Sequence, residues 1–395
     1  MTGSLVLERS IRKGSTRTVK IVLTHPYCWP YVRRGSERFL AELAREFTQR
    51  GHEVTTISSR PGGYKRESTE YGPRILVRQW WHPLMGKVRI QGTHTFAPSC
   101  FYEILRAKAD IVFCLHYIDA WVANIARTWG GFKTVYYLTG PPIPQFLPRI
   151  PPDRMMLKSV IQHSNSVITL GDFCGSLVQK HYGVTPELIP VPVDLVKFTA
   201  KRERPSGPPT LLGIASFDER RKGIRVLIES FAKIKQSIPD ARLILSGRFP
   251  DAIQNEVLAP LPSEVRESIE VLGVGSIDDL PQIYQRATVT VIPSVWEAYG
   301  MTALESLASG TPVVGADHAG LRELLNNPDV SIKFDPATEG FETTNSDGLV
   351  AAIKQGIDLA RQPETIERCR NEAEKYGWGS LGNDYESLLQ KVANR

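Results

Sequence analysis

The most informative segment of the chain runs Ser294-Val-Trp-Glu297-Ala-Tyr-Gly300-Met-Thr-Ala-Leu-Glu305-Ser-Leu-Ala-Ser-Gly310-Thr-Pro-Val-Val314. Residues 287–293 before it form a β-branched run that is typical of a buried strand. After Gly300, apolar residues recur at helical spacing until a glycine closes the helix. Residues 311–316 then indicate the next parallel strand. The pattern predicts one strand–loop–helix–strand unit, with Glu297 in the loop and Glu305 on the helix.

Such a unit suits a nucleotide sugar. The free backbone N–H groups at a helix N-terminus attract phosphate, and Gly300 lets a ligand approach the backbone closely. Glu305, one turn into the helix, can accept hydrogen bonds from two neighbouring ribose hydroxyls. Glu297 would face the sugar beyond the phosphates. The alternative is that two glutamates eight residues apart are solvated surface charges.

The same segment resembles the Glu-x7-Glu signature of retaining glycosyltransferases with the GT-B fold, the large group 4 family. The resemblance is carried by Pro293, Ser294, Glu297, Gly300, Glu305, Ala308, Gly310, Pro312 and Val313. It implies an α/β protein of two Rossmann-like domains, with parallel sheets facing across a cleft and a C-terminal helix crossing back to the first domain. It also implies that Gly300, Met301, Thr302 and Glu305 bind the donor.

Length and composition are those of a folded protein with two domains. The chain has 395 residues, of which 42% are hydrophobic and 23% charged. It contains neither a run of 18 apolar residues nor the basic and apolar regions of a signal peptide. Five scattered cysteines without a C-x-x-C pair indicate reduced thiols, with Cys114 and Cys174 buried. These features predict a cytoplasmic protein.

Charge is unevenly distributed along the chain. Residues 1–200 hold 26 Lys and Arg against 14 Asp and Glu, a net charge of +12. Residues 201–395 hold 22 against 28, a net charge of −6, and the two halves together give the +6 of the whole chain. A basic half beside an acidic half indicates that one domain meets something anionic, unless the charges are only solvated surface.

The chain opens like a Rossmann-like domain. Residues 19–24 indicate a strand, residues 35–47 an amphipathic helix and residues 50–57 a second strand. In the family that the chain resembles, a Gly-containing loop ahead of this helix meets the donor diphosphate. Gly35 matches that loop, whereas Arg34 stands where the family often has a second glycine.

Four residues of this first half are candidates for the acceptor side. Trp80 and Trp81, beside Lys and Arg residues, could dock at a lipid interface, wall an acceptor pocket or be partly buried. Residues 110–116 indicate a strand that ends at His116, which faces the cleft or is structural. Residues 134–139 indicate the next strand, where the family often has a histidine followed by glycine and this chain has Thr139.

Two domains are expected from the remaining pattern. Residues 187–194 resemble the element that ends the family's first domain, and residues 201–209 have the composition of a linker. The sequence therefore predicts an acceptor-binding domain over 1–200 and a donor-binding domain over 210–377. The final helix, 378–395, is expected to pack back on the first domain.

Basic residues in the second domain are candidates for the phosphate site. Lys222, before a glycine, matches the family's lysine on the donor phosphates, and Ser216 stands where the family usually has an arginine. Arg220 or Arg221 could supply that charge from the same loop, although Arg220-Arg221-Lys222 could also be a solvated turn. Because no Asp-x-Asp sequence exists, we expect cationic side chains and a helix dipole to replace a metal ion.

The resemblance also covers a loop later in the second domain. Gly320 and Glu323 resemble the family's glycine-rich loop and helix facing the donor, whereas Asp317 and His318 have no explanation from the sequence. The predicted catalytic group is Glu297, Lys222 and Arg221. The predicted donor-binding group is Gly35, Ser216, Arg220, Gly300, Met301, Thr302, Glu305 and Gly320.

Together these features predict a metal-independent, retaining transferase that moves a hexose from a UDP- or GDP-sugar to an acceptor hydroxyl. No cofactor is expected, since the nucleotide sugar is a substrate, and no nucleic acid partner. The resemblance implies that the departing phosphate takes the acceptor proton. The expected acceptor is anionic or lipid-linked, as in glycolipid or polysaccharide assembly, with contact at the inner face of a membrane.

Three alternatives remain from the sequence. The first is transfer to a small soluble acceptor. The second is a catalytically silent relative that binds a nucleotide or a partner, which the departures at Ser216 and Thr139 keep open. The third, an NAD-dependent enzyme, is disfavoured because no G-x-G-x-x-G follows the first strand.

Overall fold

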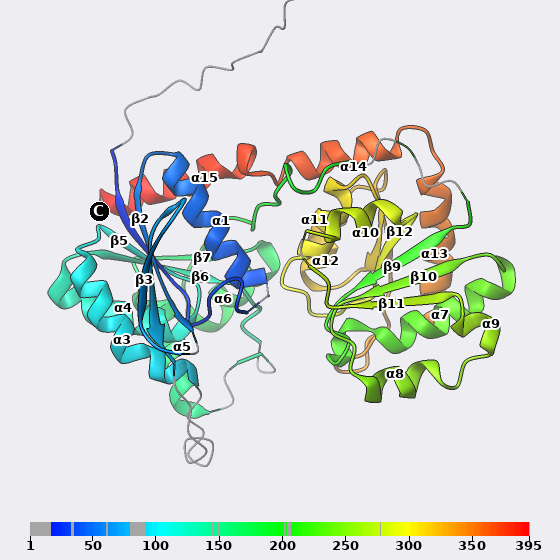
Figure 1. The fold of residues 1–395 in the computed structure, drawn as a ribbon, viewed down its shortest axis with the longest axis horizontal. Helices are drawn as coiled ribbons and strands as arrows, with labels where there is room; N and C mark the ends of the chain where they lie inside the picture. Colours follow the sequence, from blue (N-terminus) through cyan, green and yellow to red (C-terminus); the bar gives the residue numbers. More distant parts are fainter. Residues whose placement is uncertain are drawn as a thin grey trace, which may run out of the picture.

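The computed structural model describes residues 17–32, 35–60, 62–79, 92–143, 146–147, 150–200, 203, 207–276 and 278–394. Its strands form two sheets, which lie in the left and right halves of Figure 1. The first sheet has eight strands in the order β3-β4-β2-β1-β5-β6-β7-β8, and the second has six in the order β11-β10-β9-β12-β13-β14. All neighbouring strands are parallel except β3 and β4. The expected architecture of two α/β domains with parallel sheets is therefore confirmed.

Strands and helices alternate through the N-terminal domain except at β2, β3 and β4, which follow one another. Its strands are β1 Lys20–Thr24, β2 Glu53–Arg60, β3 Lys65–Thr69, β4 Gly72–Arg78, β5 Ile111–Cys114, β6 Lys133–Leu138, β7 Ser166–Thr169 and β8 Glu187–Leu188. Its helices are α1 Gly35–Gln49, α3 Gly92–Ala107, α4 Tyr117–Gly130, α5 Pro151–His163 and α6 Asp172–Tyr182. A helix between two strands carries the chain back to the end of the sheet where the previous strand began, so the two strands run parallel.

The C-terminal domain repeats the alternation. Its strands are β9 Thr210–Ile214, β10 Arg242–Ser246, β11 Ile269–Gly273, β12 Val289–Ile292, β13 Val313–Ala316 and β14 Ser331–Phe334. Its helical elements are the 3-10 turn η1 Arg220–Lys222 and the helices α7 Ile224–Ser237, α8 Asp251–Leu258, α9 Ser263–Arg266, α10 Leu280–Arg286, α11 Met301–Ala308, α12 Ala319–Leu324 and α13 Ser346–Ala360. Two further helices, α14 Thr365–Glu374 and α15 Trp378–Ala393, follow.

The central strands are buried on both faces, as a parallel sheet between two helical layers requires. Every residue of β5, β7, β12 and β13 is buried. Helix α1 turns Phe39, Leu43 and Phe47 toward the first sheet, which is why its apolar residues recur every three to four positions.

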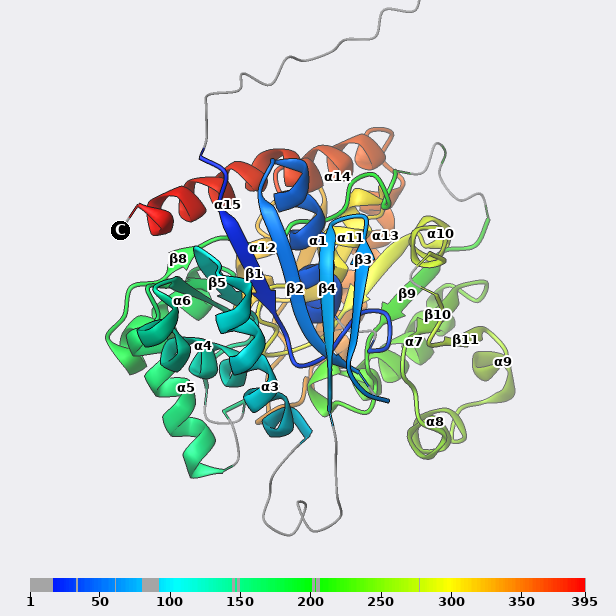
Figure 2. The same ribbon diagram turned by 60° about the vertical axis from the view of Figure 1, so that its left-hand side comes forward.

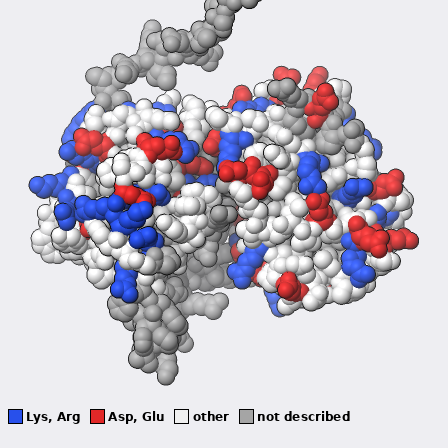
Figure 3. Space-filling view, viewed as in Figure 1, with Lys and Arg blue, Asp and Glu red and all other residues white. Residues whose placement is uncertain are grey.

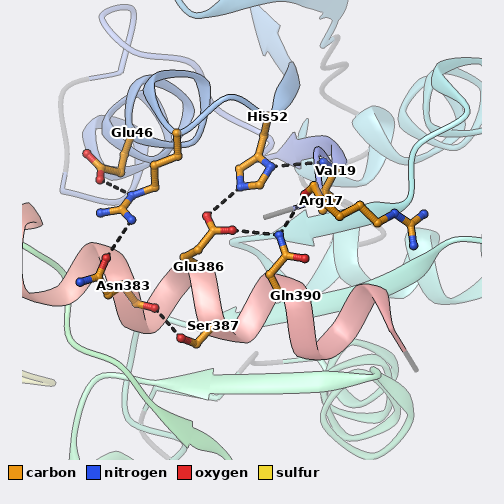
Figure 4. A network of polar contacts seen from close by, with 9 residues as sticks. Arg17, Val19, Glu46, His52, Asn383, Glu386, Ser387 and Gln390 are labelled. Atoms are coloured by element: carbon orange, nitrogen blue, oxygen red, sulfur yellow. Dashed lines mark hydrogen bonds and ion pairs between the residues drawn. The ribbon is translucent and has the colours of Figure 1, made fainter. Parts of the chain in front are cut away.

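The last helix crosses back to the N-terminal domain, as the resemblance implies. Helix α15 lies along the first sheet in both views (Figures 1 and 2). Its Tyr385 is fully buried and donates a hydrogen bond to the carbonyl of Pro190 at 2.8 Å. Figure 4 shows two polar contacts of the same helix, from Glu386 to the His52 ring (2.8 Å) and from Gln390 to the Arg17 carbonyl (3.0 Å).

An arginine of α14 contacts the segment that connects the two domains. The guanidinium of Arg370 donates to the carbonyls of Phe198 (2.8 Å) and Leu195 (3.1 Å), both in the connecting segment. It also donates to the carbonyl of Ala308 at the end of α11 (3.3 Å). The connection is thus fastened to the helix that carries Glu305.

The expectation that a strand ends at His116 is wrong. Strand β5 ends at Cys114, and His116 is the N-cap of α4. Its Nδ1 accepts a hydrogen bond from the backbone N–H of Ile118 at 3.3 Å. An imidazole nitrogen here satisfies an amide that the first turn of a helix leaves unpaired, so His116 belongs to the start of the helix.

All five cysteines are buried and free, including Cys114 and Cys174 as predicted. Within the described part of the chain, no helix is both long and apolar enough to cross a membrane.

Candidate functional site

The two domains meet at the carboxyl ends of their strands. The Cys174 thiol, one turn after β7, lies 3.7 Å from the carbonyl of Ala298, which follows β12. Glu323 of α12 reaches the first turn of α6, where its carboxylate accepts hydrogen bonds from the backbone N–H groups of Phe173 and Asp172. Loops at the carboxyl ends of parallel strands are where α/β proteins place their ligands. The candidate site lies at this boundary.

Glu297, Lys222 and Arg221 form one cluster on the C-terminal side. The Glu297 carboxylate pairs with the ammonium of Lys222 and lies 3.4 Å from the Arg221 guanidinium. The three side chains are only 16–17% exposed. Burial opposes ionisation of Glu297, but the charges of Lys222 and Arg221 outweigh it and hold its pKa below the usual value. The carboxylate is therefore ionised at neutral pH.

The backbone brings these residues together. Gly223, at φ +69°, ends the 3-10 turn η1, and a Cβ there would lie 2.9 Å from the carbonyl of Pro293. The backbone N–H of Val295 donates to the carbonyl of Arg221 at 2.9 Å. The turn that carries Lys222 thus packs directly on the loop that carries Glu297, because only a glycine fits between them.

Arg220, in contrast, lies apart from this cluster. Its side chain is 74% exposed and pairs with Glu342 at 3.3 Å. Of the two arginines that could supply a second cation, only Arg221 is beside Lys222 and Glu297 in the structure.

Glu305 is held by a residue that the sequence did not indicate. One of its carboxylate oxygens pairs with the guanidinium of Arg38, on α1 of the other domain, and the second accepts a hydrogen bond from the hydroxyl of Tyr284 at 2.9 Å. Arg38 also pairs with Glu42 at 3.3 Å. Burial opposes the charge on Arg38, but these two carboxylates outweigh it and raise its pKa. Arg38 therefore ties the two domains together at Glu305.

The first turn of α11 lies next to this pair. Gly300 is its N-cap at φ +128°, and no side chain caps the helix there. The N–H groups of Met301 and Thr302 consequently have no partner within the helix. A Cβ on Gly300 would lie 2.7 Å from the Leu321 side chain, so this close packing needs a glycine.

The remaining predicted donor residues lie around the boundary. Gly35 begins α1, one turn before Arg38. Apart from its chain neighbours and the backbone of its own helix, no heavy atom of the described residues lies within 4 Å of the position that a Cβ would take there. Ser216 is half-buried in the loop after β9. Gly320 donates its N–H to the carbonyl of Glu297 at 3.0 Å and so supports the Glu297 loop.

Substituting Gly320 by alanine is expected to destabilise the protein. An added Cβ would lie 2.3 Å from the carbonyl oxygen of Ala298, a backbone atom that cannot move without shifting the Glu297 loop. We expect a loss of about 2 kcal/mol in the free energy of unfolding, typical of overpacking. Chemical denaturation would measure it. Gly379→Ala, at an exposed helical position with open space, is the matched control, and equal stability of the two variants would contradict this packing.

The predicted acceptor residues Thr139 and His116 lie at the carboxyl edge of the first sheet. Thr139 is half-buried directly after β6. The rings of His116 and His25 lie 6.2 Å apart. Burial and the neighbouring His25 and His94 lower the pKa of His116 to about 3, so its ring is neutral. Trp80 and Trp81 lie outside the described residues.

A buried carboxyl, Asp119, underlies this edge. One of its oxygens accepts a hydrogen bond from the hydroxyl of Thr24 at 2.6 Å, whereas the other has no partner among the described residues. Burial raises the pKa of Asp119 to about 8, although hydrogen bonds from Thr24 and the backbone oppose the shift. The folded protein therefore holds this proton more tightly than the unfolded chain does.

This linkage predicts a pH dependence of stability. The contribution of Asp119 is fully present below its unfolded pKa of about 4 and is lost as the pH rises through about 8. Asp119→Asn should lack this component, so the melting temperature of the variant relative to wild type should rise from about pH 5 to about pH 8. Asp358→Asn, at a position 74% exposed, is the control. A pH-independent difference would contradict the buried, protonated carboxyl.

Family models match both halves of the chain. Residues 33–197 match the model described as Glycosyltransferase Family 4, and residues 208–357 match the model described as Glycosyl transferases group 1. The second match contains Lys222, Glu297, Glu305 and Gly320.

Similar proteins include a lipid glycosyltransferase. The phosphatidyl-myo-inositol mannosyltransferase of Mycobacterium tuberculosis (strain CDC 1551 / Oshkosh) is 28% identical over 214 residues, which are 52% of this chain and 54% of that protein. The matched part of this chain spans about half the length of its curated relatives or less. The share ranges from 27% to 54% of the relative's own length.

Solved structures share the whole architecture. The sucrose-phosphate synthase of Thermosynechococcus elongatus superimposes with a TM-score of 0.77 at 18% identity, over 95% of this chain and 99% of that one. Anabaena Alr3699/HepE in complex with UDP superimposes with a TM-score of 0.73 at 16% identity, over 94% and 100%. With both halves matched in order and the two-domain fold shared, this chain belongs to the group 4 glycosyltransferase family and has the GT-B fold.

Proposed function

We propose that this protein transfers a hexose from a UDP- or GDP-sugar to an acceptor hydroxyl, with retention of the anomeric configuration and without a metal ion. The observation that carries the proposal is the convergence of Lys222 and Arg221 on Glu297, beside the uncapped first turn of α11. Two cations and a helix N-terminus are what a departing nucleoside diphosphate requires.

Each group has a distinct task in this mechanism. Lys222 and Arg221 neutralise the charge that develops on the leaving diphosphate, and the N–H groups of Met301 and Thr302 bind its oxygens. The ionised Glu297 accepts hydrogen bonds from hydroxyls of the transferred sugar. The leaving phosphate takes the proton of the acceptor hydroxyl, which attacks from the same face, so no strong general base is needed.

Glu305 is assigned to the ribose. A carboxylate can accept about four hydrogen bonds, and Arg38 and Tyr284 use one on each oxygen. The assignment gives the remaining lone pairs to two ribose hydroxyls. In this assignment Arg38 and Tyr284 are positioning residues, because they hold the carboxylate and do not contact the reacting atoms.

The acceptor is assigned to the basic N-terminal half, and we favour an anionic or lipid-linked molecule. In the view of Figure 3, Lys and Arg side chains gather on the part of the N-terminal domain that lies away from the C-terminal domain. The relative from M. tuberculosis is named for transfer to phosphatidyl-myo-inositol, which is such an acceptor. Membrane contact at the inner face would follow. A small soluble acceptor is the second candidate.

Salt dependence tests the acceptor assignment. Binding to vesicles that contain phosphatidylglycerol or phosphatidylinositol should weaken when the salt concentration rises, because exposed charges are screened. Neutral phosphatidylcholine vesicles are the control. Binding that is absent, or equal on both kinds of vesicle, would remove the membrane from the proposal and favour the soluble acceptor.

Calorimetry with UDP and GDP tests the donor. We expect one nucleoside diphosphate to bind clearly more tightly than the other, and its glucose or mannose conjugate to be turned over. Release of the diphosphate should accelerate when an acceptor is added. Binding of UDP or GDP without turnover of any conjugate would support the catalytically silent alternative, and no binding of either would overturn the proposal.

A further inference from the structure

A cavity of about 470 Å³ lies at the boundary of the two domains, where α6 faces α12 (Figure 1). The N-terminal domain contributes Asp172, Phe173 and Ser176, and the C-terminal domain contributes Trp296, His318 and Arg322. Neither Lys222 nor Arg221 nor Glu305 lines it. The cavity is therefore separate from these three residues, although Glu323, on the helix that the resemblance places facing the donor, lines it and both domains build its walls.

Trp296 is held in this cavity at a conformational cost. Its φ of +60° lies in the left-handed region, which a bulky side chain rarely adopts. Both of its N–H groups are paired: the backbone N–H donates to Nδ1 of His318 at 3.2 Å, and the indole N–H donates to the Gly340 carbonyl at 3.2 Å. Strain of this kind is retained where surrounding contacts over-determine it, which is common at binding sites.

The rings around Trp296 leave an aromatic wall. The indole lies 6.4 Å from the Phe173 ring of the other domain and 4.5 Å from the His318 ring, which meets it edge-on. Trp296 is only half-buried, so part of its surface remains open to the cavity. An indole face packs well against the C–H face of a sugar ring, because both surfaces are apolar and flat.

Polar groups accompany the aromatic wall. Since Nδ1 of His318 accepts a hydrogen bond, the proton of its neutral ring is on Nε2, which is a donor. Burial and the charge of Arg322 lower the pKa of His318, so the ring remains neutral at pH 7, although Asp317 opposes the shift. The hydroxyl of Ser176 and the carboxylate of Asp172 add acceptors.

The charges favour a neutral, hydroxylated ligand over a phosphate. Among the residues that the structure describes, Arg322 is the only Lys or Arg that lines the cavity, and it is paired with Asp317 at 3.1 Å. Glu323, which also lines it, is engaged with the first turn of α6. A wall of aromatic rings with a few donors and acceptors matches a sugar, which has an apolar face and a polar edge.

We propose that this cavity is a saccharide subsite that holds a sugar unit of the acceptor, with its ring against the indole of Trp296. The inference rests on the proposed transferase function. The subsite would lie next to the reaction because Trp296 directly precedes Glu297, and the N–H of Gly320 donates to the Glu297 carbonyl at 3.0 Å. An acceptor sugar bound there would therefore contact the loop that positions Glu297.

Saturation-transfer NMR tests the subsite with two probes, methyl α-D-glucopyranoside and methyl α-D-mannopyranoside, in the presence and absence of UDP or GDP. We expect wild type to transfer saturation to at least one probe, and Trp296→Ala to bind it roughly tenfold more weakly or not at all. Trp129→Ala is the matched control, since Trp129 is 70% exposed on α4 of the first domain. It should bind the probe as wild type does.

A second variant blocks the cavity from the other wall. Ser176 is exposed on α6, and its hydroxyl donates only to the carbonyl of Phe173 in its own helix, at 3.0 Å. Ser176→Tyr should therefore fold and fill the cavity, with loss of the sugar signal but unchanged calorimetric affinity for UDP or GDP. Ser387→Tyr is the control, because Ser387 is exposed on α15 with the same kind of contact, to Asn383 at 2.8 Å.

The outcomes separate this inference from the proposed function. Nucleotide binding by wild type with no sugar signal, or with a signal that survives in both Trp296→Ala and Ser176→Tyr, would overturn the subsite alone. A Trp296-dependent sugar signal in a protein that binds no nucleotide would leave a sugar site but overturn its acceptor role. Loss of nucleotide affinity in Ser176→Tyr would assign the cavity to the donor, and would also overturn the inference.

Discussion

Lys222→Ala is expected to lower kcat/KM for the nucleotide sugar by about 10²- to 10³-fold, the usual loss when one preorganised group that stabilises developing charge is removed. The ammonium of Lys222 is 16% exposed and contacts Glu297, so water cannot readily replace it. Steady-state kinetics with the UDP- or GDP-sugar that binds would measure the loss. Lys354→Ala, at an exposed position on α13, is the matched control. Activity equal to wild type would remove Lys222 from the phosphate role.

The same variant should also change the pH profile. In wild type, Lys222 and Arg221 outweigh the burial of Glu297 and keep its pKa below the usual value, so the carboxylate stays ionised into mildly acidic solution. Without Lys222, only Arg221 at 3.4 Å and the hydrogen bond with Ser294 are left to oppose the effect of burial, and the pKa of Glu297 should rise. We expect the acidic limb of the residual activity to move to higher pH. Lys222→Arg, which keeps the charge, should keep the limb near its wild-type position.

Glu305→Ala should raise the donor KM by about 10²-fold or more, because a site built to accept hydrogen bonds from hydroxyls loses most of its affinity when the acceptor is removed. It should also destabilise the protein by about 3 kcal/mol, since the buried Arg38 loses one of its two carboxylate partners. The two effects must be measured separately, the first by steady-state kinetics with the nucleotide sugar and the second by chemical denaturation.

Glu42→Gln separates the two roles of this network. Glu42 pairs with Arg38, whereas Tyr284 donates to Glu305, so substitution of Glu42 should cost stability and leave the donor KM near the wild-type value. Glu305→Gln, which keeps one acceptor oxygen, should lie between wild type and Glu305→Ala in donor affinity. An unchanged KM in Glu305→Ala would show that this carboxylate only ties the domains together.

Much of the fold could be predicted because its signals are local. The β-branched runs before Pro293 and after Gly310 become β12 and β13, and the apolar spacing after Gly300 becomes α11. The predicted cluster of Glu297 with Lys222 and Arg221 also forms, because two glycine-dependent turns at the ends of neighbouring strands place these residues together. Their roles in transfer stay predictions until the variants are measured.

Other features followed only from the arrangement of distant segments. The spacing of residues along the sequence does not distinguish Arg220 from Arg221. In the structure the Arg220 side chain is 74% exposed and that of Arg221 is 17% exposed, because the neighbouring loop covers only one side of η1. His116 looked like the end of a strand, since its role as a cap depends on where the next helix begins.

The amino-acid order alone was sufficient for the parallel α/β architecture and the positions of the two glutamates, since strand and helix periods and turn residues lie within short segments. The crossing of the C-terminal helix was implied only by the resemblance to the family. The tertiary structure decided which partner each of those groups has. Arg38 meets Glu305 across 267 residues of chain, and Trp296 meets Phe173 across the domain boundary. Such contacts depend on how two separately folded sheets are placed against each other, and no local pattern encodes that placement.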